Sequence, residues 1–309
     1  MRALVTGGAG FIGSNIAAAL CGRGDRVTIL DDLSSGSASN LDSIPQAEFV
    51  EGSVLDAELV SSVAQGADVA FHHAASVGNK RSIDDPRFDA MTNVIGTVNV
   101  LEACRHAGVR KMVFASSAGI FGELKGLPIS ESHPVEPDSP YGASKLAAEK
   151  DCLVYAKLYD LEAVALRYFN VYGPNQRFDA YGNVIPIFVF QMLRGEPITI
   201  FGDGEQTRDF ISVHDVVQAN LKAADATGVS GAFNLGSGSS ISINELVRDL
   251  AALMPKEPEI LHGPPRPGDV RDSLADISKA RATLGFSPAV GLSEGLVEYV
   301  DWARSEVAG

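Results

Sequence analysis

The first half of the chain alternates short apolar runs with stretches of helical periodicity. The apolar runs, rich in Val, Ile, Ala and Phe, predict strands at residues 2–6, 26–31, 48–51, 68–72, 111–116 and 162–169. Helical patterns between them cover residues 11–22, 57–64, 86–107 and 140–159. Nearly continuous apolar strands that alternate with helices are typical of a parallel sheet buried on both faces. The pattern therefore predicts an α/β protein.

The pattern changes near residue 170. Beyond it Pro and Gly are frequent, helical stretches are shorter, and segments such as GPNQRFDAYGNVIP predict long ordered loops. We expect a Rossmann-like doubly wound parallel sheet over residues 1–169 and a smaller C-terminal α/β substrate domain over 170–309. Part of residues 208–240 is expected to pack back onto the first domain.

The composition and net charge of the chain limit the kinds of partner that it is expected to bind. The 309 residues are 45% hydrophobic and carry a formal net charge of −14, with a pI of about 4.8. Such a surface repels phosphate backbones and anionic lipids, so we expect neither a nucleic-acid nor a membrane partner. No apolar run approaches the ~20 residues of a membrane span, and three scattered cysteines fit a reducing compartment. The expected location is cytoplasmic.

A glycine-rich turn joins the first predicted strand to the first helix. The sequence TGGAGFIG spaces Gly7, Gly10 and Gly13 as in dinucleotide-binding turns, with Phe11 and Ile12 at the helix start. Gly7 permits the tight turn, Gly10 lets backbone approach a pyrophosphate, and Gly13 lets the helix pack on the strand.

An acidic residue follows this turn at the distance expected for a ribose contact. Asp31 and Asp32 end the second strand, about 20 residues on, in the segment DDLSSG with Ser35 and Gly36. A carboxylate here binds ribose hydroxyls and repels a 2′-phosphate, so the expected cofactor is NAD rather than NADP.

Tyr141 and Lys145 form the candidate catalytic pair. They stand four residues apart at the start of a predicted helix and so share one face. A nearby ammonium, together with a positive nicotinamide, favours the phenolate and makes Tyr141 a usable base. Ser116 and Ser117 end the preceding strand, at the edge that faces the ligand crevice of a parallel sheet. We expect Ser117 to bond the reacting oxygen of the substrate.

This combination resembles the extended short-chain dehydrogenase/reductase family over essentially the whole chain. The motifs that carry the resemblance are TGGAGFIG, DDLSSG, HHAA, NVIGTVNVLEA, SSAGIFG, YGASK, RYFNVYGP, GDGEQTRDFISVHDV and RPGDVRDSLAD. Within the family, the chain is most similar to UDP-hexose 4-epimerases. The resemblance implies a UDP-sugar substrate and NAD as the cofactor.

The resemblance also implies roles for further residues. Ser117, Tyr141 and Lys145 match the catalytic set. The positions that match contacts to NAD are Ala74, Ala75, Asn93, Ser116 and Phe169. The positions that match the sugar–diphosphate and uridine pocket are Asn170, Val184, Phe201, Arg208, Arg266 and Asp269. Two arginines on a diphosphate are physically sensible, because the guanidinium fork fits phosphate oxygens.

The residues after Ser117 bear on the reaction. Dehydratases and decarboxylases of this family carry an acid there, whereas this chain has Ala118 and Gly119. Without an acid to drive elimination, a 4-keto sugar is reduced again, which the resemblance implies is 4-epimerisation between gluco and galacto configurations. An NAD-binding sensor or scaffold without activity and a reductase that releases its cofactor are the alternatives.

Two residues point to different sugars. Ser273 matches a position where a bulky tyrosine is associated with exclusion of N-acetyl sugars, so serine favours UDP-N-acetylglucosamine beside UDP-glucose. Arg177 lies where related UDP-glucuronate 4-epimerases have an arginine, although Asn170 replaces their usual threonine. We expect neutral hexoses, with UDP-glucuronate as the alternative.

Two further features complete the expectations. The chain departs from its relatives at Ser53, where an adenine-contacting Asp is usual, and at Phe121, where Tyr is usual.

The helices at 93–107 and 145–159 have apolar faces on both sides, and family members pair through such helices. We therefore expect a homodimer.

Overall fold

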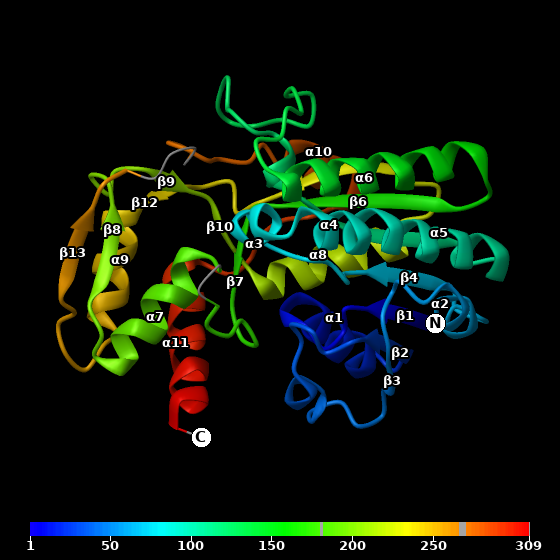
Figure 1. Ribbon diagram of the computed structural model, residues 1–309, viewed down its shortest axis with the longest axis horizontal. Helices are drawn as coiled ribbons and strands as arrows, with labels where there is room; N and C mark the ends of the chain where they lie inside the picture. The colour runs from blue at the N-terminus through cyan, green and yellow to red at the C-terminus, as the bar shows by residue number, and fades with distance from the viewer. Residues whose placement is uncertain (180–181, 266–269, 309) are drawn as a thin grey trace.

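The computed structural model describes residues 1–179, 182–265 and 270–308. In this part of the chain the central sheet has seven parallel strands in the order β11–β6–β5–β4–β1–β2–β3 (Figure 1). These strands are β1 (Arg2–Thr6), β2 (Arg26–Asp31), β3 (Glu48–Glu51), β4 (Val69–His72), β5 (Lys111–Ser117), β6 (Glu162–Tyr168) and β11 (Gly231–Leu235). The predicted doubly wound sheet is confirmed.

Helices cover both faces of this sheet, each over its own apolar layer. One layer packs α1 (Phe11–Gly22) against α8 (Val213–Asp225). The opposite layer packs α2 (Ala57–Val63), α5 (Gly96–Ala107) and α6 (Pro140–Leu158). Strand order reverses between β1 and β4, and this reversal opens the ligand crevice at the carboxyl ends of the strands.

One predicted helix is interrupted. The pattern over 86–107 folds as α4 (Pro86–Ala90), a π-helical turn at Met91–Ile95, and α5. The buried side chain of Asn93 lies within that turn. Hydrophobic periodicity does not reveal such a turn, because the apolar positions on either side still repeat with nearly helical spacing.

Most of the elements after β6 build a smaller unit beside the sheet, at the left in Figure 1. Its apolar core lies between α7, α9, α11 and β8. The helices are α7 (Val184–Arg194), α9 (Ile243–Ala252) and α11 (Leu292–Ala308), whereas α10 (Ser278–Leu284) packs on the sheet domain against β11 and α8. The short strands are β7 (Asn170–Tyr172), β8 (Ile198–Phe201), β9 (Thr207–Arg208), β10 (Phe210–Ser212), β12 (Ile241–Ser242) and β13 (Ile260–Gly263).

The chain crosses between the two units more than once. After β7 and the β8–β10 segment, α8 and β11 return to the sheet, where β11 pairs in parallel with β6. Strand β7 pairs with β10, which leads directly into α8. Within the described residues, no helix is both long and apolar enough to cross a membrane.

Candidate active site

The turn between β1 and α1 packs backbone against backbone. Gly7 has φ +69°, and a Cβ there would stand 2.5 Å from the amide nitrogen of Ala74. A Cβ on Gly13 would collide with the Gly7 carbonyl, whereas one on Gly10 would meet just that carbonyl oxygen, at 3.2 Å. Helix α1 has no side-chain cap. The open side at Gly10 and the uncapped amides of α1 fit the pyrophosphate of a dinucleotide.

The predicted ribose-binding segment packs on this turn. Asp31 is 7% exposed, and its carboxylate accepts hydrogen bonds from the amides of Ala9 at 2.9 Å and Leu33 at 2.8 Å. Burial raises the pKa of Asp31, and these amides oppose the rise. Asp32 and Ser35 are exposed, and a Cβ on Gly36 would lie 2.9 Å from Ala9. The fold thus brings the predicted NAD residues of both motifs together.

The catalytic set meets at the N-terminal end of α6. Ser139 caps this helix by accepting from the amide of Gly142 at 3.1 Å. Gly119 lies between the other groups: a Cβ there would stand 3.3 Å from Ser117 Oγ and 3.6 Å from Tyr141 Cε1. A Cβ at 119 would therefore press on Ser117 Oγ and touch the Tyr141 ring, so Ser117 and Tyr141 both lie beside Gly119.

Lys145 lies one turn further along α6, 3% exposed. Its ammonium stands 4.5 Å from the centroid of the Phe114 ring. Burial lowers the pKa of Lys145 to about 8, although the carboxylates of Asp89 and Glu149 oppose this. A cation held against an aromatic face at low solvent exposure is set to bind an additional polar ligand, such as ribose hydroxyls.

The protonation of Tyr141 differs from the sequence expectation. Burial raises the pKa of Tyr141, and a hydrogen bond with Ser117 opposes the rise. In the protein alone, desolvation of the phenolate outweighs the hydrogen bond with Ser117, and the charge of Asp89 adds to the rise in the pKa of Tyr141. The sequence expectation also relied on the positive charge of the nicotinamide in bound NAD to stabilise the phenolate.

The side chains of two residues expected to contact NAD, Ser116 and Asn93, are hydrogen-bonded within the protein. Ser116 donates to Glu149 at 2.7 Å, and Arg167 binds the same carboxylate through Nε at 3.0 Å and Nη2 at 2.7 Å. Both charged partners are buried, at 0% and 4% exposure. This cluster, called here the Glu149 clamp, joins α6 to β5 and β6 behind the catalytic residues.

Asn93 is the second such residue. Its amide oxygen accepts from Ser76 N at 2.8 Å, and its amide nitrogen donates to Ser76 O, Asp89 and Ser144. The Ser144 hydroxyl in turn donates to Asp89. Ser144 directly precedes Lys145 in the chain. Asn93 therefore fixes the loop after β4 and the first turns of α6. The sequence gives no sign of Asp89 or Glu149 as partners, because their spacing resembles that of ordinary helix-surface acids.

The remaining positions predicted to line NAD lie at the carboxyl edge of the sheet. The Ala74 amide donates to Thr6 Oγ1 at 3.3 Å, directly after β4. Ala75 follows it and is half-buried. Phe169 follows β6, is 7% exposed, and its ring stands 6.4 Å from that of Phe121. These three residues frame the crevice between the glycine turn and α6.

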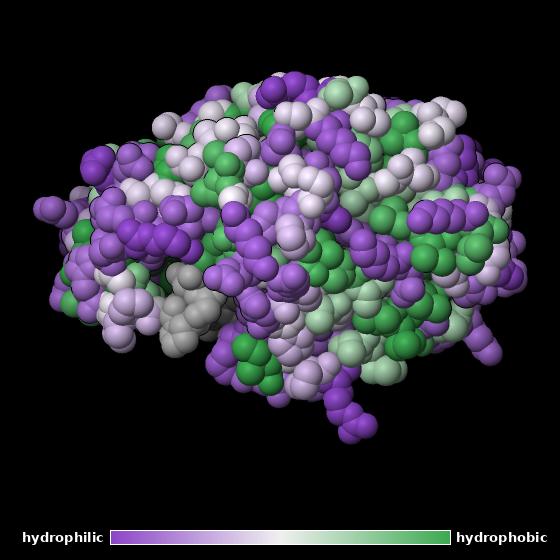
Figure 2. Space-filling view, turned by 90° about the horizontal axis from the view of Figure 1, so that it is seen from above, coloured by the Kyte–Doolittle hydropathy of each residue, from purple (hydrophilic) through white to green (hydrophobic). Residues whose placement is uncertain are grey.

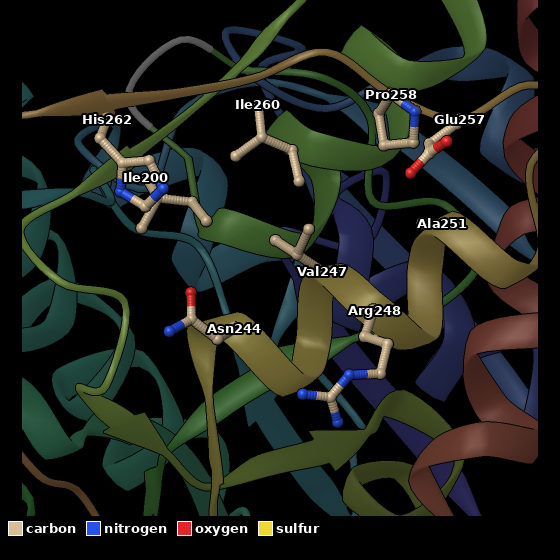
Figure 3. Close-up of a pocket in the computed structure, with 9 residues that line it drawn as sticks. All are labelled: Ile200, Asn244, Val247, Arg248, Ala251, Glu257, Pro258, Ile260 and His262. Carbon is tan, nitrogen blue, oxygen red and sulfur yellow. The ribbon is translucent and has the colours of Figure 1, made fainter.

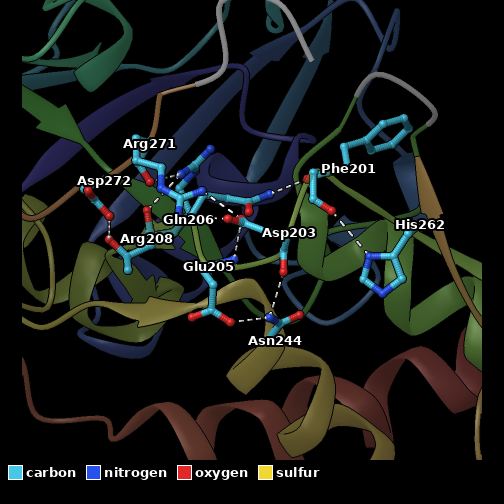
Figure 4. A network of polar contacts seen from close by, with 11 residues as sticks. Phe201, Asp203, Glu205, Gln206, Arg208, Asn244, His262, Arg271 and Asp272 are labelled. Atoms are coloured by element: carbon cyan, nitrogen blue, oxygen red, sulfur yellow. Dashed lines mark hydrogen bonds and ion pairs between the residues drawn. The ribbon is translucent and has the colours of Figure 1, made fainter. Parts of the chain in front are cut away.

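The predicted sugar–diphosphate residues lie on the short strands of the smaller unit. Arg208 donates to the carbonyl of Thr207 at 2.8 Å, within the polar network drawn in Figure 4. Phe201 belongs to the same network, where its carbonyl accepts from Gln206 at 2.9 Å. Val184 starts α7 and is half-buried. Arg266 and Asp269 lie outside the described residues.

A buried carboxylate that the sequence analysis overlooked organises this end of the site. Asp209 is 0% exposed and accepts from the amides of Ser237, Gly238 and Ala275, at 2.7 to 3.2 Å. Its backbone carbonyl accepts from the Asn170 side chain at 3.0 Å. Asp209 thereby positions Asn170 and the segment that contains the half-buried Ser273.

The guanidinium of Arg177 already has hydrogen-bond partners within the protein. Its guanidinium binds Glu306 at 2.8 Å and donates to Asn40 at 2.6 Å and to Ser39 at 3.1 Å. These partners lie on α11 and on the short helical turn at Ala38–Leu41. In this structure the guanidinium of Arg177 is therefore held by protein partners.

A pocket of about 300 Å³ opens elsewhere in the smaller unit, between α9 and β13 (Figure 3). Ile200, Val247 and Ile260 line its apolar part. Because neighbouring residues of a strand face opposite sides, Ile200 points away from the side of Phe201. Asn244 and His262 also line this pocket, and both belong to the network of Figure 4 that contains Phe201 and Arg208.

The solved structures that are similar to this chain include three UDP-sugar 4-epimerases. A UDP-glucose 4-epimerase from Thermotoga maritima, solved with UDP-glucose, has a TM-score of 0.94 and 41% identity, covering 99% of this chain and 100% of that one. A UDP-N-acetylglucosamine 4-epimerase from Methanobrevibacter ruminantium, in complex with UDP-N-acetylmuramic acid, gives 0.94 and 36%, covering 99% and 98%. A UDP-glucuronic acid 4-epimerase from Bacillus cereus, with UDP-glucuronic acid and NAD, gives 0.92 and 34%, covering 99% and 100%.

Sequence comparison agrees. A UDP-glucose 4-epimerase from Mycolicibacterium smegmatis is 45% identical over 313 residues, covering 99% of each chain. The model of the NAD dependent epimerase/dehydratase family matches residues 3–236, which contain both the glycine turn and the catalytic set. The resemblance seen in the motifs and the expected cofactor, NAD, are both confirmed. The chain belongs to the NAD-dependent epimerase/dehydratase family.

Proposed function

We propose that this protein is an NAD-dependent UDP-sugar 4-epimerase that interconverts gluco and galacto configurations. One observation carries the proposal: Ser117 and Tyr141 converge on Gly119, with Lys145 one turn further along α6. A hydroxyl pair beside a lysine suits oxidation at a carbinol carbon. No acid follows Ser117, so nothing there would protonate a leaving hydroxyl. The UDP-glucose 4-epimerases among the relatives support this reaction.

The chain's residues have distinct tasks in this reaction. Tyr141 takes the proton of the C4 hydroxyl while Ser117 donates a hydrogen bond to the same oxygen. Bound NAD would supply the hydride acceptor for oxidation at C4 and the hydride donor for reduction of the 4-keto sugar. Tyr141 then gives the proton back. Lys145 holds the ribose hydroxyls and adds positive charge that favours the phenolate.

Neutral hexoses are the proposed substrates, with UDP-glucose accepted beside UDP-N-acetylglucosamine. The small side chain of Ser273 leaves room for an acetamido group. The UDP-glucuronate alternative rests on Arg177, whose guanidinium is already bound to Glu306 and Asn40. A sugar carboxylate would have to displace these partners, so this contact pattern favours the neutral sugars.

The test is to assay purified protein with UDP-glucose, UDP-N-acetylglucosamine and UDP-glucuronate, without added NAD. We expect conversion of the first two to their 4-epimers. Retained NAD would separate an epimerase from a reductase that releases its cofactor. Absence of turnover on all three sugars, with NAD still bound, would favour the sensor or scaffold alternative.

A homodimer through α5 and α6 is part of the proposal. These helices pack against each other, yet leave Met91 47%, Ile95 44%, Val154 44% and Leu158 66% exposed on and beside them. Apolar residues also gather over the sheet domain on the face shown in Figure 2. Exposed apolar clusters of this kind mark interfaces. Sedimentation at micromolar concentration should give a dimer, and Leu158→Glu should weaken it.

A further inference from the structure

Residues 174–177, called here the strap, follow β7 and run between the two units of the molecule (Figure 1). On one side the strap binds the first turns of α1. The amide nitrogen of the Asn15 side chain donates to the Pro174 carbonyl at 3.0 Å. The side chain of Asn175 donates to Ser14 Oγ at 3.0 Å. The strap therefore rests directly beside the glycine turn.

On its other side the strap binds α11. The Tyr299 hydroxyl donates to the Gln176 carbonyl at 2.6 Å. Arg177 Nε donates to Glu306 at 2.8 Å, and the guanidinium carbon lies 5.9 Å from the centroid of the Trp302 ring. The strap is thus fastened to the smaller unit by both main chain and side chain.

Arg177 extends this connection to the loop at 35–40. Its Nη1 donates to Asn40 Oδ1 at 2.6 Å and its Nη2 to Ser39 Oγ at 3.1 Å. Asn40 is 7% exposed, and its amide nitrogen donates to the carbonyl of Ala9 within the glycine turn at 2.8 Å. One guanidinium therefore joins α11 to the loop that packs on the dinucleotide turn.

We propose that Arg177 is a positioning residue that latches loop 35–40 to α11 and slows the escape of NAD. The loop follows Asp31 and packs on the glycine turn at Gly36 and Asn40. We expect the loop to hinder the release of NAD from between that acid and that turn. This inference rests on the proposed function, because an epimerase must return the hydride to the sugar and so keeps its cofactor through turnover.

The geometry also explains why an arginine serves here. A planar fork with several donors can satisfy a carboxylate, an amide oxygen and a hydroxyl at once, whereas lysine offers a single point charge. The Arg177 and Glu306 side chains are 34% and 30% exposed. The latch is therefore accessible enough to open, and its contribution should appear as a rate of release rather than as a loss of folding.

The test measures NAD release without any sugar. Purified protein with bound NAD is passed into NAD-free buffer, and retained NAD is quantified at intervals by enzymatic cycling. We expect Arg177→Met to release NAD about tenfold faster, equivalent to about 1.4 kcal/mol. Arg177→Lys should lie between this variant and the parent. Arg304→Met, on the same helix and bound to Asp301, is the matched control and should release NAD at the parental rate.

Two outcomes would overturn the latch. One is an unchanged release rate in Arg177→Met, provided that its thermal unfolding matches the parent. The other is an unchanged release rate with a KM that rises for UDP-glucuronate alone, which would mark Arg177 as a carboxylate receptor. Faster release in Arg177→Met from a parent that epimerises no UDP-sugar would support the latch while refuting the proposed function.

Discussion

The catalytic corner and the sugar–diphosphate end of the site are built in different ways. At the catalytic corner, Lys145 is 3% exposed and is supported from behind by the Glu149 clamp, whose ion pair is buried. At the other end, Arg271 and Asp203 form an ion pair with 59% and 57% of their side chains exposed. The first region holds its polar groups in regular elements, and the second holds them in loops and short strands.

The difference in solvent exposure suits the two regions to different tasks, one to catalysis and the other to recognition. Electrostatic catalysis needs groups fixed in a poorly solvated site before the substrate arrives, because water would screen them. Recognition of a nucleotide sugar tolerates side chains that order on binding. The chemistry should therefore be sensitive to single buried groups, while sugar choice should change by smaller steps.

The largest expected effect is at Tyr141. Tyr141→Phe keeps the ring but removes the acid–base group, so turnover should fall by about 10²- to 10⁴-fold. The measurement is UDP-glucose to UDP-galactose conversion, with NAD content determined in parallel. Tyr155→Phe, on the same helix and bound to Glu102, is the control. Turnover within about threefold of the parent in Tyr141→Phe would refute its role as the base.

The Glu149 clamp comes next. Glu149→Leu leaves Arg167 charged, buried and unpaired, which should cost about 3–5 kcal/mol of unfolding free energy, whereas the double variant with Arg167→Met should recover most of it. Urea unfolding of NAD-free protein measures both. Asp301→Asn breaks an exposed pair and should change stability by about 0–1 kcal/mol. A double variant as unstable as the single one would show that the clamp is not an isolated charge pair.

The ammonium of Lys145 should destabilise the NAD-free protein, because burial lowers its pKa from 10.5 to about 8. Lys145→Met should stop turnover yet raise the unfolding free energy at pH 7 by up to about 3 kcal/mol. As pH rises from 8 toward 10.5, the folded state loses the Lys145 proton before the unfolded state does. The parent then gains stability, and the advantage of the variant shrinks.

The matched control for this variant is Lys150→Met, at an exposed position of the same helix. It should leave stability nearly unchanged at every pH. Chemical unfolding across pH 7 to 10.5 measures the trend. A Lys145→Met advantage that stays constant with pH would mean that packing, rather than the buried charge, causes it.

The smallest expected effect is on sugar choice. Ser273→Tyr fills the space proposed for the acetamido group, so kcat/KM for UDP-N-acetylglucosamine should fall by about tenfold or more. The kcat/KM for UDP-glucose should stay within about threefold of the parental value. Ser273→Ala keeps the side chain small and is the control. An equal loss on both sugars would place Ser273 outside a size-selective pocket.

The catalytic corner could be predicted because its signals are local. Gly7 and Gly13 mark a turn that excludes a Cβ, and the four-residue spacing of Tyr141 and Lys145 places them on one helix face. The strand pattern predicts which edge of the sheet carries Ser117. Each of these inferences needs just one element and its neighbours.

The supporting network could not be predicted in this way. Ser116 and Glu149 are 33 residues apart, and Asn93 and Ser144 are 51 apart. Their pairing depends on how α5 and α6 pack on the sheet. Arg177 shows the same limit: its partner Asn40 is 137 residues away, so the sequence suggested a sugar carboxylate where the fold supplies protein partners.

The sequence by itself therefore determined the doubly wound sheet, the glycine turn after β1 and the shared helix face of Tyr141 and Lys145, because periodicity, turn chemistry and helical spacing are short-range properties. The tertiary structure decided how the charges are paired. It buried Glu149 against Arg167, raised the pKa of Tyr141 by desolvation, and turned Arg177 into a bridge between the two units. Such pairings depend on distances between elements far apart in the chain, and only the packed molecule sets those distances.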